Sequence, residues 1–249
     1  MAKAADVART ARILGALERA HPEAECALHY NSAFELVAAT ILSAQCTDQR
    51  VNMVTPVLFG RYPTPAALAE ADTAELESII RSTGFFRAKA KSLMGCARAL
   101  VRDHGGEVPR SLDALVKLPG IGRKTANVVL GHAFGIAEGV AVDTHVLRVS
   151  NRLGMARGDD PILVERQLMA LVPQEKWTRT TDLLIFHGRK ICDARRPACG
   201  TCPIFALCSW DDRQAWATAP LGQRPKPTTR AKRPKEAKRP PRKASRRKR

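Results

Sequence analysis

The sequence predicts an all-α fold. Only 5% of its 249 residues are aromatic, whereas Ala and Leu are abundant, and β-rich folds depend on aromatic and β-branched residues. Apolar residues recur at helical spacing along most of the chain, and we find no two-residue hairpin or long alternating strand. Hydrophobic residues make up 45% of the chain, which is enough to bury a core, so we expect short helices with short connections.

The first half of the chain is expected to form five helices. The first ends at His21-Pro22, and the second is capped by Asn31 or Ser32 and is apolar almost all round, hence buried. Glycine or proline ends the other three, and the fifth is basic and amphipathic. The expected ranges are 5–20, 34–44, 48–60, 73–84 and 87–103.

The second half is expected to add four helices after a break. An apolar turn at 112–116 leads into Leu118-Pro119-Gly120-Ile121-Gly122, where proline and two glycines interrupt the helical pattern. Helical spacing of apolar residues resumes beyond this segment. The expected ranges are 123–133, 144–153, 161–171 and 175–190.

The formal net charge of +17 predicts a polyanionic partner. Residues 221–249 hold 14 Lys and Arg against one acid, Glu236, whereas residues 1–220 hold 27 basic and 23 acidic residues. Because the tail has almost no apolar residues, it cannot offset its ordering entropy, and we expect it to be disordered. Its charge density favours a nonspecific DNA tether over a merely solubilising tail.

No apolar run reaches the roughly 18 residues of a membrane span, and the first residues lack the apolar core of a signal peptide. We therefore expect no membrane partner and a cytoplasmic location. The seven cysteines are then expected to be thiols or metal ligands rather than disulfides. Cys26, Cys46 and Cys96 are scattered in apolar patterns and are interpreted as small core residues.

The turn between Leu118 and Arg123 predicts a phosphate site. Gly120 and Gly122 allow a tight turn whose backbone can approach a partner closely. The next helix begins at Arg123 with free N–H groups, and these groups and the helix dipole favour an anion such as a DNA phosphate. Two glycines alone are weak evidence, because many connections between helices contain glycine.

Two residues at helix starts are candidates for catalysis. Lys124 lies in a first helical turn, where the dipole disfavours a cation, so an amine shielded from water would be neutral and able to form a Schiff base. Asp143 stands at an N-cap, where N–H groups would keep its carboxylate ionised beside a developing sugar cation. Taken alone, Lys124 is better interpreted as a surface lysine that holds a phosphate, and Asp143 as a simple helix cap.

Four clustered cysteines predict a metal centre. Cys192, Cys199, Cys202 and Cys208 have the spacing C-x6-C-x2-C-x5-C, and thiolate quartets hold zinc or an iron–sulfur cluster. Zinc sites more often show two short spacings, so the pattern leans only slightly to iron–sulfur. Between the first two cysteines lie Arg195 and Arg196, whose guanidinium groups such a loop could press against phosphates.

Together these motifs resemble the endonuclease III family of DNA glycosylases, in the helix-hairpin-helix-GPD superfamily. The resemblance covers roughly residues 5–212, and the strings occur in the order of the family. These strings are LSAQCTDQRVN (42–52), LPGIGRKTANVVL (118–130), VDTHVLRVSNRLG (142–154) and the cysteine run (192–208).

The resemblance implies two helical domains flanking a DNA cleft. A six-helix domain with the hairpin would span 26–137, and an iron–sulfur domain would span 138–212 and pack with the N-terminal helix at 1–25. The basic, mostly disordered tail would then be 213–249. The four cysteines would hold a [4Fe-4S] cluster.

The resemblance further implies a monomeric, bifunctional DNA N-glycosylase and abasic-site lyase of base excision repair, associated with the nucleoid if bacterial. Its partner would be double-stranded DNA containing damaged bases or abasic sites. Lys124 would attack C1′ of a flipped, oxidised pyrimidine nucleotide, and Asp143 would stabilise charge at the sugar. β-Elimination of the 3′ phosphate would follow. Gln45 would fill the gap that the flipped base leaves.

One string departs from the family pattern. A Leu normally follows the Gly of a GLYNSKA-like string, but here the string is Gly84-Phe85-Phe86-Arg87-Ala88-Lys89-Ala90, so Phe85 would be the wedge. Two other functions fit parts of the sequence: a monofunctional relative acting on adenine or mismatches, and a non-catalytic DNA-binding module with zinc. Monofunctional relatives generally lack the lysine, so Lys124 together with Asp143 favours a lyase.

Overall fold

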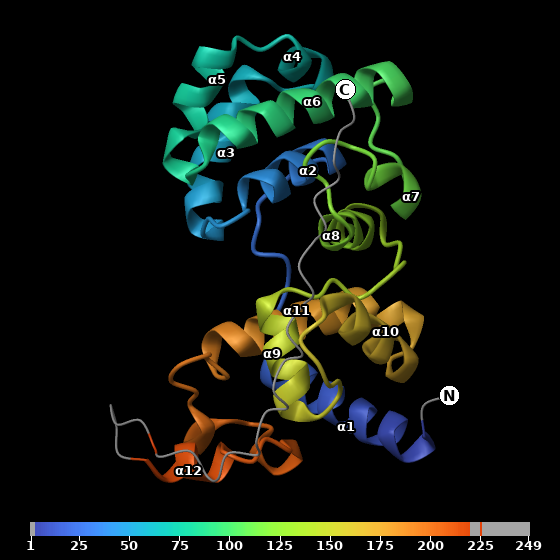
Figure 1. Ribbon diagram of the computed structural model, residues 1–249, viewed down its shortest axis with the longest axis vertical. Coiled ribbons are helices and arrows are strands. Elements are labelled where there is room, and N and C mark those ends of the chain that lie inside the picture. The colour runs from blue at the N-terminus through green and yellow to red at the C-terminus, as the bar shows by residue number, and fades with distance from the viewer. Residues whose placement is uncertain (1–2, 220–224, 226–249) are drawn as a thin grey trace, which may run out of the picture.

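The computed structural model describes residues 3–219 and residue 225, and every regular element within them is a helix (Figure 1). The predicted all-α fold is confirmed. The α-helices of this part are α1 (Ala4–Ala20), α2 (Ala33–Leu42), α3 (Asp48–Arg61), α4 (Pro65–Ala69), α5 (Thr73–Ile80), α6 (Phe86–His104), α7 (Leu112–Leu115), α8 (Arg123–Phe134), α9 (Thr144–Leu153), α10 (Pro161–Leu171), α11 (Trp177–Lys190) and α12 (Arg213–Thr218). The 3-10 turns are η1 (Arg81–Thr83), η2 (Gln174–Lys176), η3 (Cys199–Thr201) and η4 (Phe205–Leu207).

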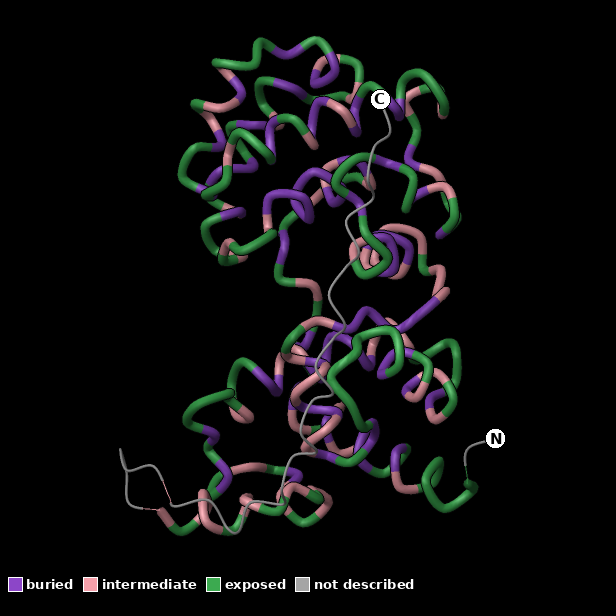
Figure 2. Tube along the Cα trace, viewed as in Figure 1, coloured by how far each residue is buried: buried purple, intermediate pink, exposed green. Residues whose placement is uncertain are grey.

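Two separate hydrophobic cores organise these helices. The first is built from α2 to α8, in the upper half of Figure 1, and the second from α1 and α9 to α11, in the lower half. Figure 2 shows buried residues running through both halves. The chain therefore leaves the second core after α1 and returns to it after α8.

Polar contacts fasten the two halves where α8 meets α10 and α11. The carboxylate of Glu165 in α10 is buried, and Arg123 donates to both of its oxygens over 2.8 and 3.1 Å. Asn127, one turn further along α8, also donates to Glu165. On the α11 side, a Cβ at Gly131 would collide with Thr178, so glycine lets the two helices approach closely.

Helix caps explain several of the bounds. Ser32, rather than Asn31, accepts from the backbone N–H of Glu35 and starts α2. The expected helix 73–84 changes its last turn to the 3-10 form, so that α5 ends at Ile80 and η1 follows. Within the described residues, no helix is long and apolar enough to cross a membrane.

Two short helices were not expected from the sequence. α4 begins with Thr64 as N-cap and Pro65 at its first position, and its five residues are too few to display helical periodicity. α12 lies at the start of the range expected to be tail, 213–249, and packs against η3, where Gly200 approaches the carbonyl of Ala217. From Pro220 onward, only residue 225 of the predicted tail is described.

Replacing Glu165 by Ala is expected to lower the free energy of unfolding by about 1–3 kcal/mol, because Arg123 and Asn127 lose their shared acceptor. Urea denaturation measures the change. The matched control is Glu107→Ala, which removes an exposed carboxylate and should change stability by less than about 0.5 kcal/mol. Equal effects of the two substitutions would contradict the fastening role of Glu165.

Candidate active site and metal centre

The predicted hairpin is a tight turn that leads directly into α8. Gly120 has φ 82°, in the left-handed region, and a Cβ there would lie 2.8 Å from the Cβ of Ser92. The turn therefore requires glycine at this position. Gly122 is the N-cap of α8 and has ordinary extended backbone, with no side-chain cap. The first N–H groups of α8 are thus left without a capping side chain and suit an anion.

Arg123 is occupied differently from what the sequence suggested. It starts the helix at the predicted phosphate site and was a candidate for contact with DNA through that site, and its guanidinium pairs with the buried carboxylate of Glu165. The residue thereby fixes the first turn of α8 relative to α10. It is the following residue, Lys124, whose side chain is exposed and available.

Lys124 and Asp143 line one cavity of about 110 Å³ between the two halves of the molecule. The helix α8 contributes Lys124, Thr125, Val128 and His132, which share a face because of their spacing. Asp143 lies at the start of α9, on the opposite side of the junction. The structure therefore brings together the two residues that the sequence singled out as candidates.

Asp143 is the N-cap of α9, as predicted. Its Oδ1 accepts hydrogen bonds from the backbone N–H groups of His145 and Val146, both over 2.8 Å. The described residues provide no hydrogen bond to Oδ2, and the side chain is half-buried. One oxygen is thus held in place by the start of α9, while the other is left without a hydrogen bond from the described residues.

Residues behind Asp143 connect it to the first cysteine. Arg148 donates to the carbonyls of Cys192 and Gly188, over 3.1 and 2.9 Å, and lies 3.1 Å from Nδ1 of His145. Burial lowers the pKa of His145, so this ring is neutral at pH 7 and serves as a hydrogen-bonding partner, in agreement with the structural role that its position suggests.

The cavity contains two side-chain contacts that the sequence gave no reason to expect. Arg189 of α11 forms an ion pair with Asp48 of α3 over 2.7 Å, and Nε2 of His132 lies 3.2 Å from Oδ1 of Asp182. Each pair joins residues far apart in the sequence, and no local pattern marks them. Only the packing of α11 against α3 and α8 brings them together.

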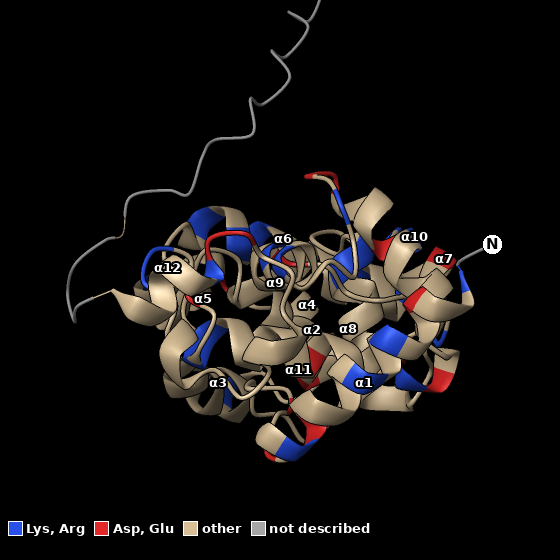
Figure 3. Ribbon diagram, turned by 90° about the horizontal axis from the view of Figure 1, so that it is seen from below, with Lys and Arg blue, Asp and Glu red and all other residues tan. Residues whose placement is uncertain are grey.

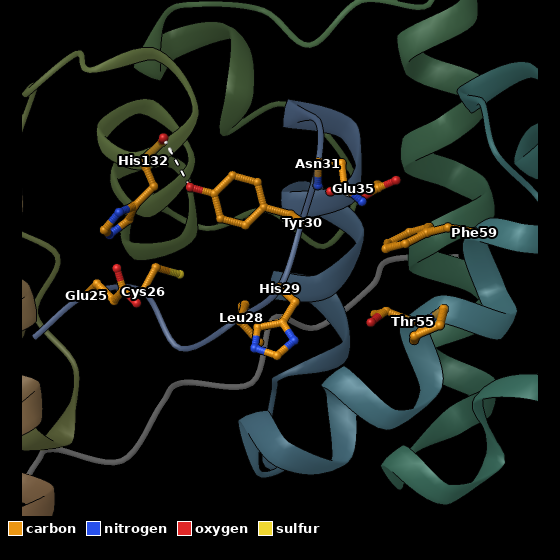
Figure 4. Close-up of a pocket in the computed structure, with 11 residues that line it drawn as sticks. Glu25, Cys26, Leu28, His29, Tyr30, Asn31, Glu35, Thr55, Phe59 and His132 are labelled. Carbon is orange, nitrogen blue, oxygen red and sulfur yellow. Dashed lines mark hydrogen bonds between the residues drawn. The ribbon is translucent and has the colours of Figure 1, made fainter. Parts of the chain in front are cut away.

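A second, more open hollow of about 590 Å³ adjoins this cavity (Figure 4). The two share Glu25, Cys26, Leu28 and His132. The hydroxyl of Tyr30 points toward α8 and donates to the carbonyl of His132 over 3.2 Å. No residue predicted to be functional lines this hollow, whereas Lys124 and Asp143 both line the smaller cavity.

Gln45 and Phe85 are the non-glycine residues with positive φ among those described, at 52° and 47°. Such conformations cost roughly 1–3 kcal/mol each and persist only where the surroundings enforce them. Both side chains are exposed, Phe85 to 67%. The two residues expected to enter the DNA stack therefore share an unusual backbone and an open position.

The four cysteines lie together at the far end of the second half, near α12. Cys199 is buried and the others are half-buried. Burial, together with a smaller effect of the three neighbouring cysteines, raises the pKa of the Cys199 thiol to about 11. Arg152 donates to Sγ of Cys192 over 3.3 Å and stacks on Trp210. None of the four lines the Lys124 cavity.

The arrangement fits a cluster better than a single ion. One zinc ion would hold sulfur atoms about 3.8 Å apart, given Zn–S bonds of about 2.3 Å. Within the described part of the chain, no group of three Cys, His, Asp or Glu is placed to hold one ion, although the thiols are close enough to affect one another. Four thiols spread around a shared space suit an iron–sulfur cluster.

Arg195 and Arg196 are exposed on the loop between the first two cysteines. Their backbone N–H groups both donate to Oδ1 of Asp193 over 2.8 Å, which forms a compact turn. No ion pair engages either guanidinium within the described ranges. Figure 3 shows Lys and Arg, and Asp and Glu, scattered over the helices.

Comparisons with known proteins give consistent matches. Residues 38–174 match the model of the HhH-GPD superfamily base excision DNA repair proteins, and residues 192–208 match the iron-sulfur binding domain of endonuclease III. Endonuclease III of Synechocystis is 54% identical over 80% of this chain and 91% of its own length. Endonuclease III of Bacillus subtilis is 51% identical over 75% and 85%.

Solved structures agree with these matches. A non-covalent complex of endonuclease III with DNA is 44% identical, with a TM-score of 0.78, over 84% of this chain and 96% of that one. A trapped covalent intermediate of endonuclease III with DNA gives the same identity and TM-score, over 84% and 97%.

Replacing Cys202 by Ser is expected to abolish the visible absorbance of the purified protein and most of its iron, because the cluster needs all four thiolates. Elemental analysis after anaerobic purification measures the iron. Cys26→Ser, outside the quartet, should keep about four iron atoms per chain. One zinc ion per chain in the unmodified protein would contradict the assignment.

Proposed function

Because the chain belongs to the endonuclease III family of HhH-GPD base excision DNA repair proteins, we propose that Lys124 and Asp143 are its catalytic residues. The enzyme is a DNA glycosylase with abasic-site lyase activity. The observation that carries the assignment is the shared cavity, because it places an amine and a carboxylate from opposite halves of the molecule at one site.

Lys124 acts as the nucleophile. Its neutral amine attacks C1′ of the flipped nucleotide, the C1′–N bond breaks, and the base leaves with the bonding electron pair and a proton. The C1′–O4′ bond of the sugar then opens, O4′ takes a proton, and C1′ becomes the carbon of an imine with Lys124. This imine makes the C2′ proton acidic, and removal of that proton expels the 3′ phosphate by β-elimination. Lys124 is exposed in the free protein, so its amine is accessible to the sugar of a bound nucleotide.

Asp143 stabilises the positive charge that develops at the sugar. The two N–H bonds hold Oδ1, so the carboxylate needs no reorganisation when the charge appears. The same carboxylate can accept a proton from the attacking amine. Asp48 and Arg189, which line the cavity as an ion pair, face the flipped base.

The hairpin and the cluster loop hold the DNA backbone. Backbone N–H groups around Gly120 and Gly122 bind one phosphate at the positive end of α8, and Arg195 and Arg196 bind others. Gln45 fills the gap in the stack and Phe85 contacts the opposite strand, where its ring can stack rather than only wedge.

The four cysteines hold a [4Fe-4S] cluster, which cross-links the ends of the loop that carries the two arginines. The cluster lies away from the cavity, so its part is structural. The two helical domains, 26–137 and 138–212 with 1–25, face the DNA between them. The substrates are oxidised pyrimidines such as thymine glycol, and abasic sites.

The active site is complete within one chain, which supports a monomer. We place the enzyme in the cytoplasm, at the nucleoid, because its substrate is chromosomal DNA. The basic residues 221–249 add nonspecific attraction to phosphates.

Lys124→Ala should abolish the covalent protein–DNA adduct that borohydride traps on a thymine glycol duplex, because no other amine forms the imine. Gel electrophoresis of the adduct measures the yield. Lys117→Ala removes an exposed lysine just before the hairpin and should leave the yield unchanged. An adduct of native yield from Lys124→Ala would refute the mechanism.

Asp143→Asn should slow base release by at least about 100-fold, because the amide lacks the charge that stabilises the sugar cation. Single-turnover kinetics measure the rate. The fold should be retained, since Asn caps helices as well as Asp does. Asp160→Asn, the same change at the N-cap of α10, is the matched control and should keep the native rate.

A further inference from the structure

Two loops of the first half carry the residues that are proposed to enter the DNA stack. Gln45 follows α2, and Phe85 lies between η1 and α6, so the loops are separate in the sequence. Both residues are exposed and have left-handed backbones. A feature that enforces both conformations must lie beneath the two loops.

Lys89 is that feature. Although it is a lysine, it is only 5% exposed, on the inner face of α6. Its ammonium donates to the carbonyl of Leu42 over 2.8 Å and to the carbonyl of Thr83 over 2.7 Å. Leu42 is the last residue of α2, three residues before Gln45, and Thr83 is the last residue of η1, two residues before Phe85.

The unpaired carbonyls at the C-terminal ends of α2 and η1 explain why a buried ammonium group is stable between them. The last carbonyls of a helix have no partner within it and carry partial negative charge. One ammonium with three donors satisfies an end of each element at once. Burial lowers the pKa of Lys89, and nearby Cys46 opposes that shift. The two carbonyls are the hydrogen-bond acceptors of the buried group.

We propose that Lys89 is a positioning residue that couples the two loops, so that Gln45 and Phe85 enter the duplex as one unit. The inference builds on the proposed roles of these two residues in the stack. Both loops follow carbonyls that bind the same ammonium. Displacement of one loop therefore moves Lys89 and alters its hydrogen bond to the element before the other loop. Opening of the stack and contact with the opposite strand then occur together.

The test uses Lys89→Met, which keeps the length of the side chain and removes both hydrogen bonds. Lys91→Met is the matched control, because two residues along a helix turn the side chain by about 200° to the exposed face. The probe is a duplex with a tetrahydrofuran abasic analogue beside 2-aminopurine, whose fluorescence rises when the stack opens, without any chemical step.

Lys89→Met should lose most of the fluorescence rise and slow base release from thymine glycol duplexes by about 10- to 100-fold, as expected when reacting groups are misplaced. Lys91→Met should match the native protein. On a single-stranded abasic oligonucleotide, which has no stack to open, Lys89→Met should form the borohydride adduct as the native protein does. A native fluorescence response and rate from Lys89→Met would overturn the coupling.

A second measurement keeps the native lysine and so does not depend on whether Lys89→Met folds. Gln45→Ala, Phe85→Ala and the double variant are compared in the fluorescence assay. Coupled loops give a double variant much less impaired than the product of the single effects. Strictly multiplicative effects would overturn the proposal. Absence of any adduct from the native protein would instead contradict the proposed lyase and leave this fluorescence test intact.

Discussion

The buried carboxylate of Glu165 is the contact on which the rest of the site depends. It belongs to the second core, yet it accepts from Arg123 and Asn127 of α8, which belongs to the first. Lys124 is adjacent to Arg123 in the sequence, whereas Asp143 starts a helix of the second core. Amine and carboxylate can therefore meet only while the two halves keep this relative position. Leaving a buried carboxylate without partners is unfavourable, so the junction resists separation.

Helix ends supply most of the functional groups. The N-terminus of α8 has no capping side chain, and the N-terminus of α9 holds the carboxylate of Asp143. The C-termini of α2 and η1 meet at the ammonium of Lys89. Short helices provide many helix termini within a small volume. In this way the described part of the molecule, which has no strands, gathers unpaired backbone N–H and C=O groups near the junction of its two halves.

Local signals were enough to predict much of this arrangement. The two glycines, the capping Asp143 and the cysteine spacing each depend on neighbours in the sequence, and the motifs in their order indicated the family. The long periodic helices were found for the same reason, whereas α4 and α12 are too short to show a period. The pairs Asp48–Arg189 and Arg123–Glu165 depend on tertiary packing. Lys89 is buried, although lysine is usually exposed, and no sequence pattern predicts its burial.

The route of the chain between the cores also constrains the order of events during synthesis. The segments of the first core, α2 to α8, are contiguous and can pack as soon as they leave the ribosome. The helix α1 is made before them, but its apolar face is covered by α10 and α11. That face therefore stays exposed on the nascent chain until α10 and α11 have been translated. A helix made before the first core is thus buried only after that core can form.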